Sequence, residues 1–126
     1  MRMLARREHS HLELSQKLTD YPPDEVAEAL AKLQKQDYQS DKRFAADFVQ
    51  MRFRQGKGKV LIQQHLKQKG IDDFNFKNYD FFALAKSIRL RKYGKTPPEN
   101  YQEKSKQQRF LQSRGNFLFI FALIFY

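Results

Sequence analysis

Hydrophobic residues recur along this chain at intervals of three or four positions, the spacing that places them on one face of an α-helix. Ser10-His11-Leu12-Glu13 has the form of a helix capping box, with Leu14 and Leu18 on the face that follows. Pro22-Pro23 can begin the next helix, because the first-turn N–H groups of a helix lack partners anyway. The apolar stripe of that helix contains Val26, Ala29, Leu30 and Leu33.

The same spacing predicts three further amphipathic helices. One runs from Ser40 to the break at Gly56-Lys57-Gly58, the next from there to Gly70, and the third from Asp80 to Gly94. The residues predicted to face inward are Phe44, Phe48 and Val49 in the first, Val60, Leu61, Ile62 and Leu66 in the second, and Phe81, Leu84, Ala85 and Ile88 in the third.

The helices form a repeat. Leu18, Leu66 and Leu111 each precede a chain break, at a spacing of roughly 45 residues that is typical of helical repeat arrays. A polar helix is expected over about Glu99–Ser113, and residues 71–79, rich in Phe, Asn and Asp, are interpreted as a short helix begun by its two aspartates. We therefore predict an all-α fold of three tandem three-helix modules that stack because each buries little alone: residues 1–37, 38–79 and 80–126.

The third module ends in an atypical apolar segment, in which every residue from Phe117 to Tyr126 is apolar or aromatic. Spanning a bilayer takes roughly 20 apolar residues, so this run is about half the necessary length. We expect a buried terminal helix or strand that packs against the third module. A membrane-surface anchor is an alternative, although an interfacial helix should carry a polar face and this one does not. A poorly packed terminus is another.

Positive charge is concentrated in parts of the chain. Lys and Arg number 24 against 14 Asp and Glu, a formal net charge of +10. Residues 21–40 contain more acids than bases, whereas residues 41–70 contain mostly bases. Such a local excess favours nucleic acid, an acidic membrane surface or an acidic protein groove as partner, with a merely solvated basic face as the alternative. Ten basic residues are the candidate contacts: Arg52, Arg54, Lys57, Lys59, Lys67, Lys69, Arg89, Arg91, Lys92 and Lys95.

No arrangement of residues supports catalysis. There is no cysteine for a thiolate metal site, and serine-hydrolase, Walker-type and H-E-x-x-H motifs are absent. His9 and His11 would point to different faces of a helix and do not suit a shared metal. Gly56-Lys57-Gly58-Lys59 resembles a phosphate-binding loop only superficially, and a break between helices is the simpler interpretation. We expect a non-enzymatic protein without a cofactor, and a cytoplasmic one because the N-terminus lacks an apolar signal-peptide core.

Several blocks of residues resemble the RecX family of regulatory proteins. They occur in the family's order over about residues 1–115, and this series is specific where no single block would be. In chain order the blocks are Leu4–Ser10 with Glu13-Leu14 and Lys17-Leu18, then Ser40–Ala45 with Phe48-Val49, Arg52, Gly56 and Gly58, then Arg91–Gly94 with Lys104, Lys106, Arg109–Leu111 and Arg114-Gly115.

The resemblance implies an elongated, curved array of three-helix repeats that binds the RecA filament on DNA. It implies restraint of RecA's ATPase, strand-exchange and co-protease activities, and so a place in recombination, DNA repair and the SOS response. Three features depart from the family pattern. The chain begins almost on the first motif, Lys59 stands where relatives commonly have proline, and the run from Phe117 replaces the usual amphipathic helix. The last departure leaves the final helix of the third module in question.

A helix-turn-helix-like module that binds duplex DNA directly is the alternative function, because three-helix units with basic helices fit both. Such a module needs one recognition helix, whereas three stacked repeats favour a ligand that lines a long groove. The sequence therefore favours the RecA filament as partner, together with single- or double-stranded DNA. Neither a small-molecule substrate nor a membrane is expected.

Overall fold

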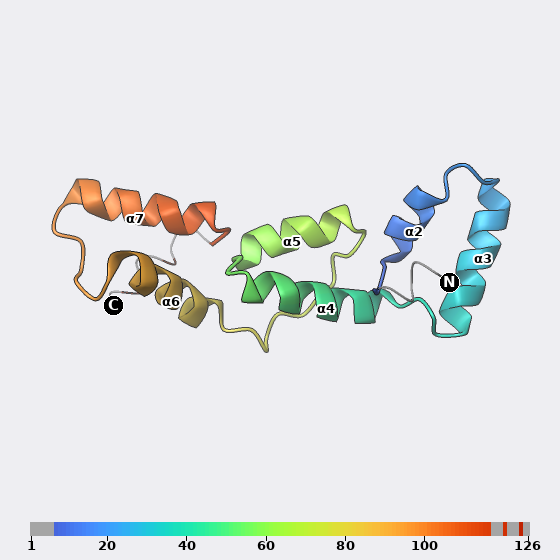
Figure 1. Cartoon of the computed structure of the whole chain (residues 1–126), viewed down its shortest axis with the longest axis horizontal. Helices are drawn as coiled ribbons and strands as arrows, with labels where there is room; N and C mark the ends of the chain where they lie inside the picture. Colours follow the sequence, from blue (N-terminus) through green and yellow to red (C-terminus); the bar gives the residue numbers. More distant parts are fainter. Residues whose placement is uncertain (1–6, 117–119, 121–123, 125–126) are drawn as a thin grey trace. The chain divides into compact units, whose positions relative to one another are not determined.

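The computed structural model describes residues 7–116, 120 and 124, and the regular elements within them are all α-helices (Figure 1). The predicted all-α fold is thereby confirmed. None of the helices in the described part of the chain is long and apolar enough to cross a membrane. The helices are α2 (His11–Lys17), α3 (Pro23–Lys35), α4 (Asp41–Arg54), α5 (Lys59–Gln68), α6 (Phe81–Tyr93) and α7 (Tyr101–Ser113).

The chain divides into two compact units. Unit 1 contains Met1–Gln50 and His65–Phe74, and unit 2 contains Met51–Gln64 and Asn75–Tyr126. Helices α4 and α5 therefore contribute residues to both units, α2 and α3 belong to unit 1, and α6 and α7 belong to unit 2.

Side-chain caps fix where the helices begin. The Ser10 hydroxyl accepts the N–H of Glu13 at 3.1 Å, and the Glu13 carboxylate accepts the N–H of Ser10 at 3.1 Å, so the predicted capping box is confirmed. Asp80 and Asn100 cap α6 and α7, each accepting the N–H three residues later. Ser40 does the same for α4 at 3.2 Å. These four caps satisfy N–H groups that a helix leaves without partners.

Residues 71–79 are not helical, so the short helix predicted there is wrong. The side chain of Asn75 accepts the N–H of Lys77 at 3.0 Å, a local bond that competes with helical pairing. Ile71 and Phe76 are buried, whereas the two aspartates between them are exposed and begin no helix. The segment is therefore an anchored loop, for which its Asn and Asp content is suited.

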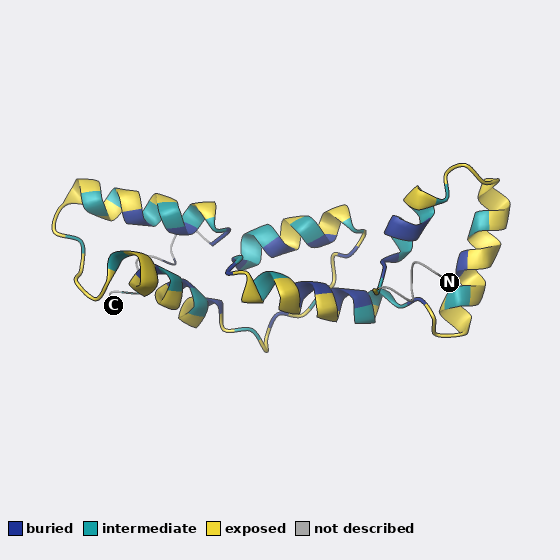
Figure 2. Ribbon diagram, in the orientation of Figure 1, coloured by how far each residue is buried: buried dark blue, intermediate teal, exposed yellow. Residues whose placement is uncertain are grey.

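The core of unit 1 comes from α2, α3, α4 and the end of α5. Figure 2 shows the buried residues of α4 along one side of the helix, as the sequence predicted. The rings of Phe44 and Phe48 stack with centroids 5.4 Å apart, and His65 meets Phe48 edge-on. In α3 the predicted stripe is narrower than expected, because Leu30 is buried but Ala29 is exposed. The buried apolar residues of the unit are Leu14, Leu30, Phe44, Ala45, Phe48, Val49, Leu66 and Ile71.

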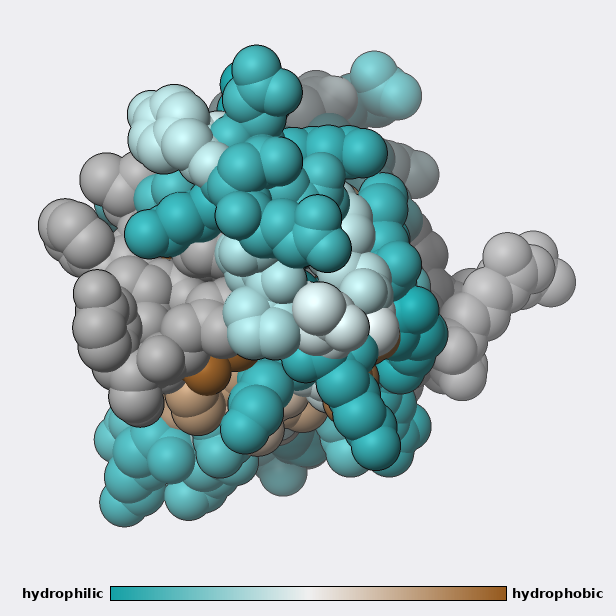
Figure 3. Space-filling view, turned by 90° about the vertical axis from the view of Figure 1, so that its left-hand side faces the viewer, coloured by the Kyte–Doolittle hydropathy of each residue, from teal (hydrophilic) through white to brown (hydrophobic). Residues whose placement is uncertain are grey.

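Unit 2 has an apolar core that includes part of the C-terminal segment. Ile120 is buried against Ala85 of α6 and Leu111 of α7, and Ile124 packs on the same cluster. The expectation that the terminal run packs against the third module is confirmed for these two isoleucines, and the other residues of 117–126 lie outside the described residues. Figure 3 views the face of unit 2 at the α6–α7 connection, where hydrophilic residues predominate and hydrophobic ones show only between them.

Two glycines bring the end of α7 against the start of α5. The N–H of Gly58 donates to the Arg114 carbonyl at 2.6 Å, and the N–H of Val60 donates to the Gly115 carbonyl at 2.9 Å. A Cβ at Gly58 would overlap the backbone of Gly115, and a Cβ at Gly115 would overlap Leu61. The N–H groups of Val60 and Leu61, in the first turn of α5, thus already have the Gly115 carbonyl as acceptor, so the glycine-lysine loop is a joint between helices and not a phosphate cradle.

Candidate functional site

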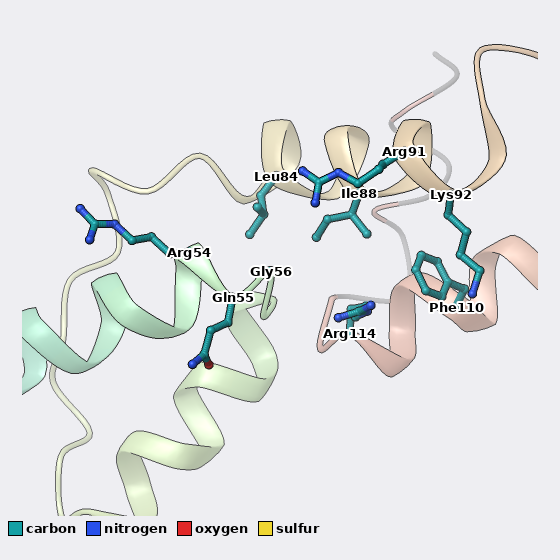
Figure 4. Close-up of a pocket in the computed structure, with 9 residues that line it drawn as sticks. All are labelled: Arg54, Gln55, Gly56, Leu84, Ile88, Arg91, Lys92, Phe110 and Arg114. Carbon is teal, nitrogen blue, oxygen red and sulfur yellow. The ribbon is translucent and has the colours of Figure 1, made fainter.

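A cleft with a volume of about 280 Å³ opens in unit 2 beside the turn between α4 and α5 (Figure 4). Residues from the end of α4, from α6 and from the end of α7 line it. We call it the basic cleft, and it is lined by Arg54, Gln55, Gly56, Leu84, Ile88, Arg91, Lys92, Phe110 and Arg114.

The floor of the basic cleft is apolar. Leu84 and Ile88 are four residues apart on α6 and therefore share a face of the helix. Figure 4 shows both side chains pointing from α6 toward the α4–α5 turn. Gly56 allows this approach, because a Cβ at that position would lie 3.1 Å from the Ile88 side chain. Both floor residues stay partly exposed, so the cleft presents apolar surface to solvent.

Four cations form the rim of the basic cleft, and one aromatic ring orients two of them. The Lys92 ammonium lies 4.2 Å from the centroid of the Phe110 ring, and the Arg114 guanidinium lies 5.5 Å from it. The face of an aromatic ring attracts cations, which favours these positions. In Figure 4 the Arg91 guanidinium lies beside Leu84 at α6, and the Arg114 guanidinium lies across from it at the end of α7. Arg54 lines the cleft from the end of α4, and in Figure 4 its guanidinium points away from Arg91 and Arg114.

The rim cations have no carboxylate partner among the described residues. Among the described residues, carboxylates pair with Arg7, Lys32, Arg43 and Lys69, and with none of the four rim cations. The reason lies in the sequence, since residues 48–71, 81–98 and 104–116, which supply the lining, contain no Asp or Glu. Concentrated charge of one sign in a concave surface with low-dielectric walls produces a strong local potential. The basic cleft is therefore suited to an anionic ligand.

Of the ten predicted contact residues, the structure brings Arg54, Arg91 and Lys92 together in the basic cleft. Arg114 joins them, although it was not among the predicted contacts. The available signal was its place beside Gly115 in the last RecX-like block, which gave no indication that the end of α7 lies near the end of α4.

Four other predicted contacts belong to unit 2 but do not line the basic cleft. Lys95 is exposed, whereas Arg52, Lys57 and Lys59 are half-buried. The Lys59 ammonium lies 5.6 Å from the centre of the Phe76 ring, which gives it a partner within the protein. These residues add positive charge to the unit without forming the rim.

Arg89 was predicted as a contact residue, and its position contradicts this. Its side chain is only 3% exposed. The guanidinium donates to the Gln107 side chain at 2.9 Å and to the carbonyls of Gly94 and Thr96 at 2.8 and 2.7 Å. A planar group with five N–H donors suits such a cluster of acceptors. Arg89 therefore fastens the α6–α7 connection to α6 and α7 from inside.

The remaining two predicted contacts, Lys67 and Lys69, belong to unit 1. Lys67 is exposed, but Lys69 binds the buried Glu13 carboxylate at 3.0 Å, together with Arg7 at 2.9 Å. Burial alone would raise the pKa of Glu13, but hydrogen bonds from Arg7, from the Ser10 backbone and from Lys69 outweigh it and lower the pKa to about 2. Lys69 thus has a carboxylate partner within the unit.

In the part of the chain that the structure describes, His9 does not belong to a group of side chains that could hold a metal ion. His9 is buried, and burial lowers the pKa of its imidazole; its Nδ1 lies 3.1 Å from the Arg7 carbonyl and its Nε2 3.3 Å from the Lys17 ammonium. Within the described residues no group of three or more His, Asp or Glu side chains could hold a metal ion.

The chain is thus a small helical protein with a cationic cleft. Family models of the second and third three-helix domains of RecX match residues 40–75 and 78–115. The chain belongs to the RecX family of regulatory proteins. It is similar to the proteins named regulatory protein RecX of Halorhodospira halophila, at 37% identity, and of Legionella pneumophila, at 38%. These alignments cover 91% of this chain and 76% and 82% of the relatives.

A solved structure agrees with this assignment. The crystal structure of a regulatory protein RecX superimposes on the chain with a TM-score of 0.81 and 27% sequence identity. The match covers 98% of this chain and 67% of the other.

Proposed function

We propose that this protein binds the RecA filament on DNA and inhibits its ATPase, strand-exchange and co-protease activities. Membership in the RecX family of regulatory proteins carries the proposal. The basic cleft supports it, because a filament of protein and DNA offers carboxylates and phosphates to cations that have no internal counter-ion. The three modules proposed from the sequence, 1–37, 38–79 and 80–126, would give the protein several contacts along such a filament. The proposed partners also place it in the cytoplasm.

RecA-catalysed ATP hydrolysis on single-stranded DNA tests the proposal. We expect inhibition at fewer than one molecule of this protein per RecA protomer. A variant with Arg52, Arg54, Lys57 and Lys59 all changed to glutamate should inhibit less while it remains folded, because these side chains lie outside the buried core. Circular dichroism of the variant is the control for folding. No inhibition by equimolar, folded wild-type protein would refute the proposed function.

The alternative function is direct binding of duplex DNA by a helix-turn-helix-like module. The half-buried and exposed bases at the α4–α5 turn favour it, since basic side chains gain by displacing counter-ions from phosphates. Anisotropy of a labelled duplex without RecA separates the two functions. Tight, strongly salt-dependent duplex binding without any effect on RecA would favour the alternative.

A further inference from the structure

We propose that the basic cleft binds an acidic peptide segment of a partner protein: an apolar side chain enters the cleft, and flanking carboxylates meet the cations of the rim. This inference deepens the proposed function and rests on it, because it assigns the cleft to the protein component of the filament and not to DNA.

The floor of the cleft is the first reason. Leu84 and Ile88 leave apolar surface open at the bottom of a hollow of about 280 Å³. Binding pockets of this kind bury an apolar group and use a few polar groups to fix its orientation. A leucine, isoleucine or phenylalanine side chain of a partner would remove this surface from water. A phosphodiester backbone has no apolar group to place there.

The rim is the second reason. Guanidinium groups bind carboxylates through two parallel hydrogen bonds, and the rim contains three of them, on Arg54, Arg91 and Arg114. The segments that line the cleft have no carboxylate of their own to offer. An apolar residue with acidic neighbours therefore complements both the floor and the rim.

The side chains around the Phe110 ring argue against nucleobases as the ligand. Proteins that bind single-stranded nucleic acid stack bases on aromatic faces. Phe110 is the aromatic residue among those lining the cleft, and Lys92 and Arg114 already lie against its ring. The ring also makes a T-shaped contact with Tyr93, with ring centroids 5.6 Å apart. The ring thus orients the rim cations and offers no platform for a base.

Fluorescence anisotropy with the full chain tests the inference without RecA. The probes are a labelled peptide with one leucine between glutamates, the same peptide with serine in place of leucine, and an oligothymidylate of equal charge. We expect the leucine peptide to bind about tenfold more tightly than the serine peptide, since burial of one apolar side chain accounts for at least this factor. Equal affinities of the two peptides would overturn the inference.

Substitutions at the rim locate the binding. Arg91→Ala and Arg114→Ala should each lower the affinity for the leucine peptide about tenfold, which is the loss expected when a charge-assisted hydrogen bond is removed. Arg109→Ala is the matched control, because Arg109 is an exposed arginine of the same unit outside the cleft. Arg91→Lys keeps the charge but removes the forked geometry, and should weaken binding less than Arg91→Ala. Oligothymidylate that binds as tightly as the leucine peptide, with the same loss at Arg91→Ala, would make the cleft a phosphate site and overturn the inference.

Cross-linking in the filament connects the site to its partner. A photoreactive benzoylphenylalanine in place of Gln55, an exposed residue of the cleft, leaves the rim and floor intact. On RecA filaments we expect an adduct with a RecA segment in which an apolar residue adjoins carboxylates. An adduct with the DNA, or none while ATP hydrolysis is still inhibited, would overturn the inference and leave the proposed function standing. If the wild-type protein has no effect on RecA, the proposed function fails and the peptide measurements alone decide.

Discussion

Replacing Gly58 with alanine should separate the end of α7 from the start of α5. Gly58 is buried, and its N–H donates to the Arg114 carbonyl at 2.6 Å. An added Cβ would overlap the carbonyl of Gly115, which is backbone and cannot rotate away as a flexible side chain would. The chain can relieve the overlap only if the end of α7 shifts. That shift would also weaken the hydrogen bond from Val60 to Gly115.

The magnitude follows from these contacts. Each of the two hydrogen bonds contributes about 0.5–1.5 kcal/mol, and forcing an extra carbon into a packed region costs about 1–3 kcal/mol. We therefore expect Gly58→Ala to lower the free energy of unfolding by about 2–6 kcal/mol. A loss of this size is a large fraction of the stability of an ordinary domain, which is about 5–15 kcal/mol.

Urea unfolding followed by circular dichroism measures the loss, and Gly94→Ala is the matched control. Gly94 has φ +78° and ψ −170°, but nothing lies within 4 Å of its missing Cβ. Its substitution therefore tests backbone strain alone, at about 1–3 kcal/mol, and should leave peptide binding at the basic cleft unchanged. Gly58→Ala should weaken that binding as well, because Arg114 moves with the end of α7. Wild-type stability and wild-type binding in Gly58→Ala would refute this view of the joint.

Three further changes test other parts of the molecule. The folded state lowers the pKa of Glu13 from 4.5 to about 2, so its carboxylate stabilises the protein above about pH 5. This stabilisation, up to about 3 kcal/mol, is lost as the pH falls toward 2. Urea unfolding across this pH interval should show a smaller loss of stability for Glu13→Gln than for the wild type, and equal losses would count against the pairing. Arg89→Ala should lower the free energy of unfolding by about 3 kcal/mol, because buried acceptors lose their donors. Trypsin should then cut after Lys95 faster than in the wild type. An unchanged cleavage rate would contradict the role of Arg89 in holding the α6–α7 connection. Ile120→Ala should cost about 2–4 kcal/mol in thermal or urea unfolding, and more than the same change at the half-buried Ile124; equal costs would show that Ile120 is not part of the core.

The local features of the fold could be predicted because the signals are local. Ser10, Ser40 and Asp80 mark helix starts by a hydrogen bond to an N–H three residues away, and the sequence alone displays that spacing. Phe44 and Phe48 face the core for the same reason, since four residues return a helix to the same face. The loop at 71–79 was wrongly predicted as a helix because its apolar residues are compatible with one. In the structure the Asn75 side chain accepts the Lys77 N–H, a local bond that competes with helix formation.

The site depends on contacts between residues far apart in the chain, and these could be predicted only in part. The sequence indicates that Arg54 and Arg91 belong to basic stretches. It does not indicate that Gly58 and Gly115 allow the end of α7 to approach the α4–α5 turn closely. This approach places Arg114 at the rim. Arg89 and Arg91 belong to the same basic stretch of α6. They point about 200° apart around the helix axis, so Arg89 is buried in the core whereas Arg91 is not.

Net charge alone therefore describes the binding chemistry of this protein poorly. Arg7 and Lys69 share the Glu13 carboxylate, and Arg89 is satisfied by carbonyls and a glutamine, so part of the positive charge stabilises the fold. The rim of the basic cleft differs because the segments that line it contain no Asp or Glu, and among the described residues no carboxylate pairs with a rim cation. Dissolved anions balance such a cation in the free protein, and an anionic partner can replace them. The helices that line the cleft contribute no carboxylate to it and leave Leu84 and Ile88 partly exposed. A ligand with both an apolar group and carboxylates would therefore match the floor and the rim together.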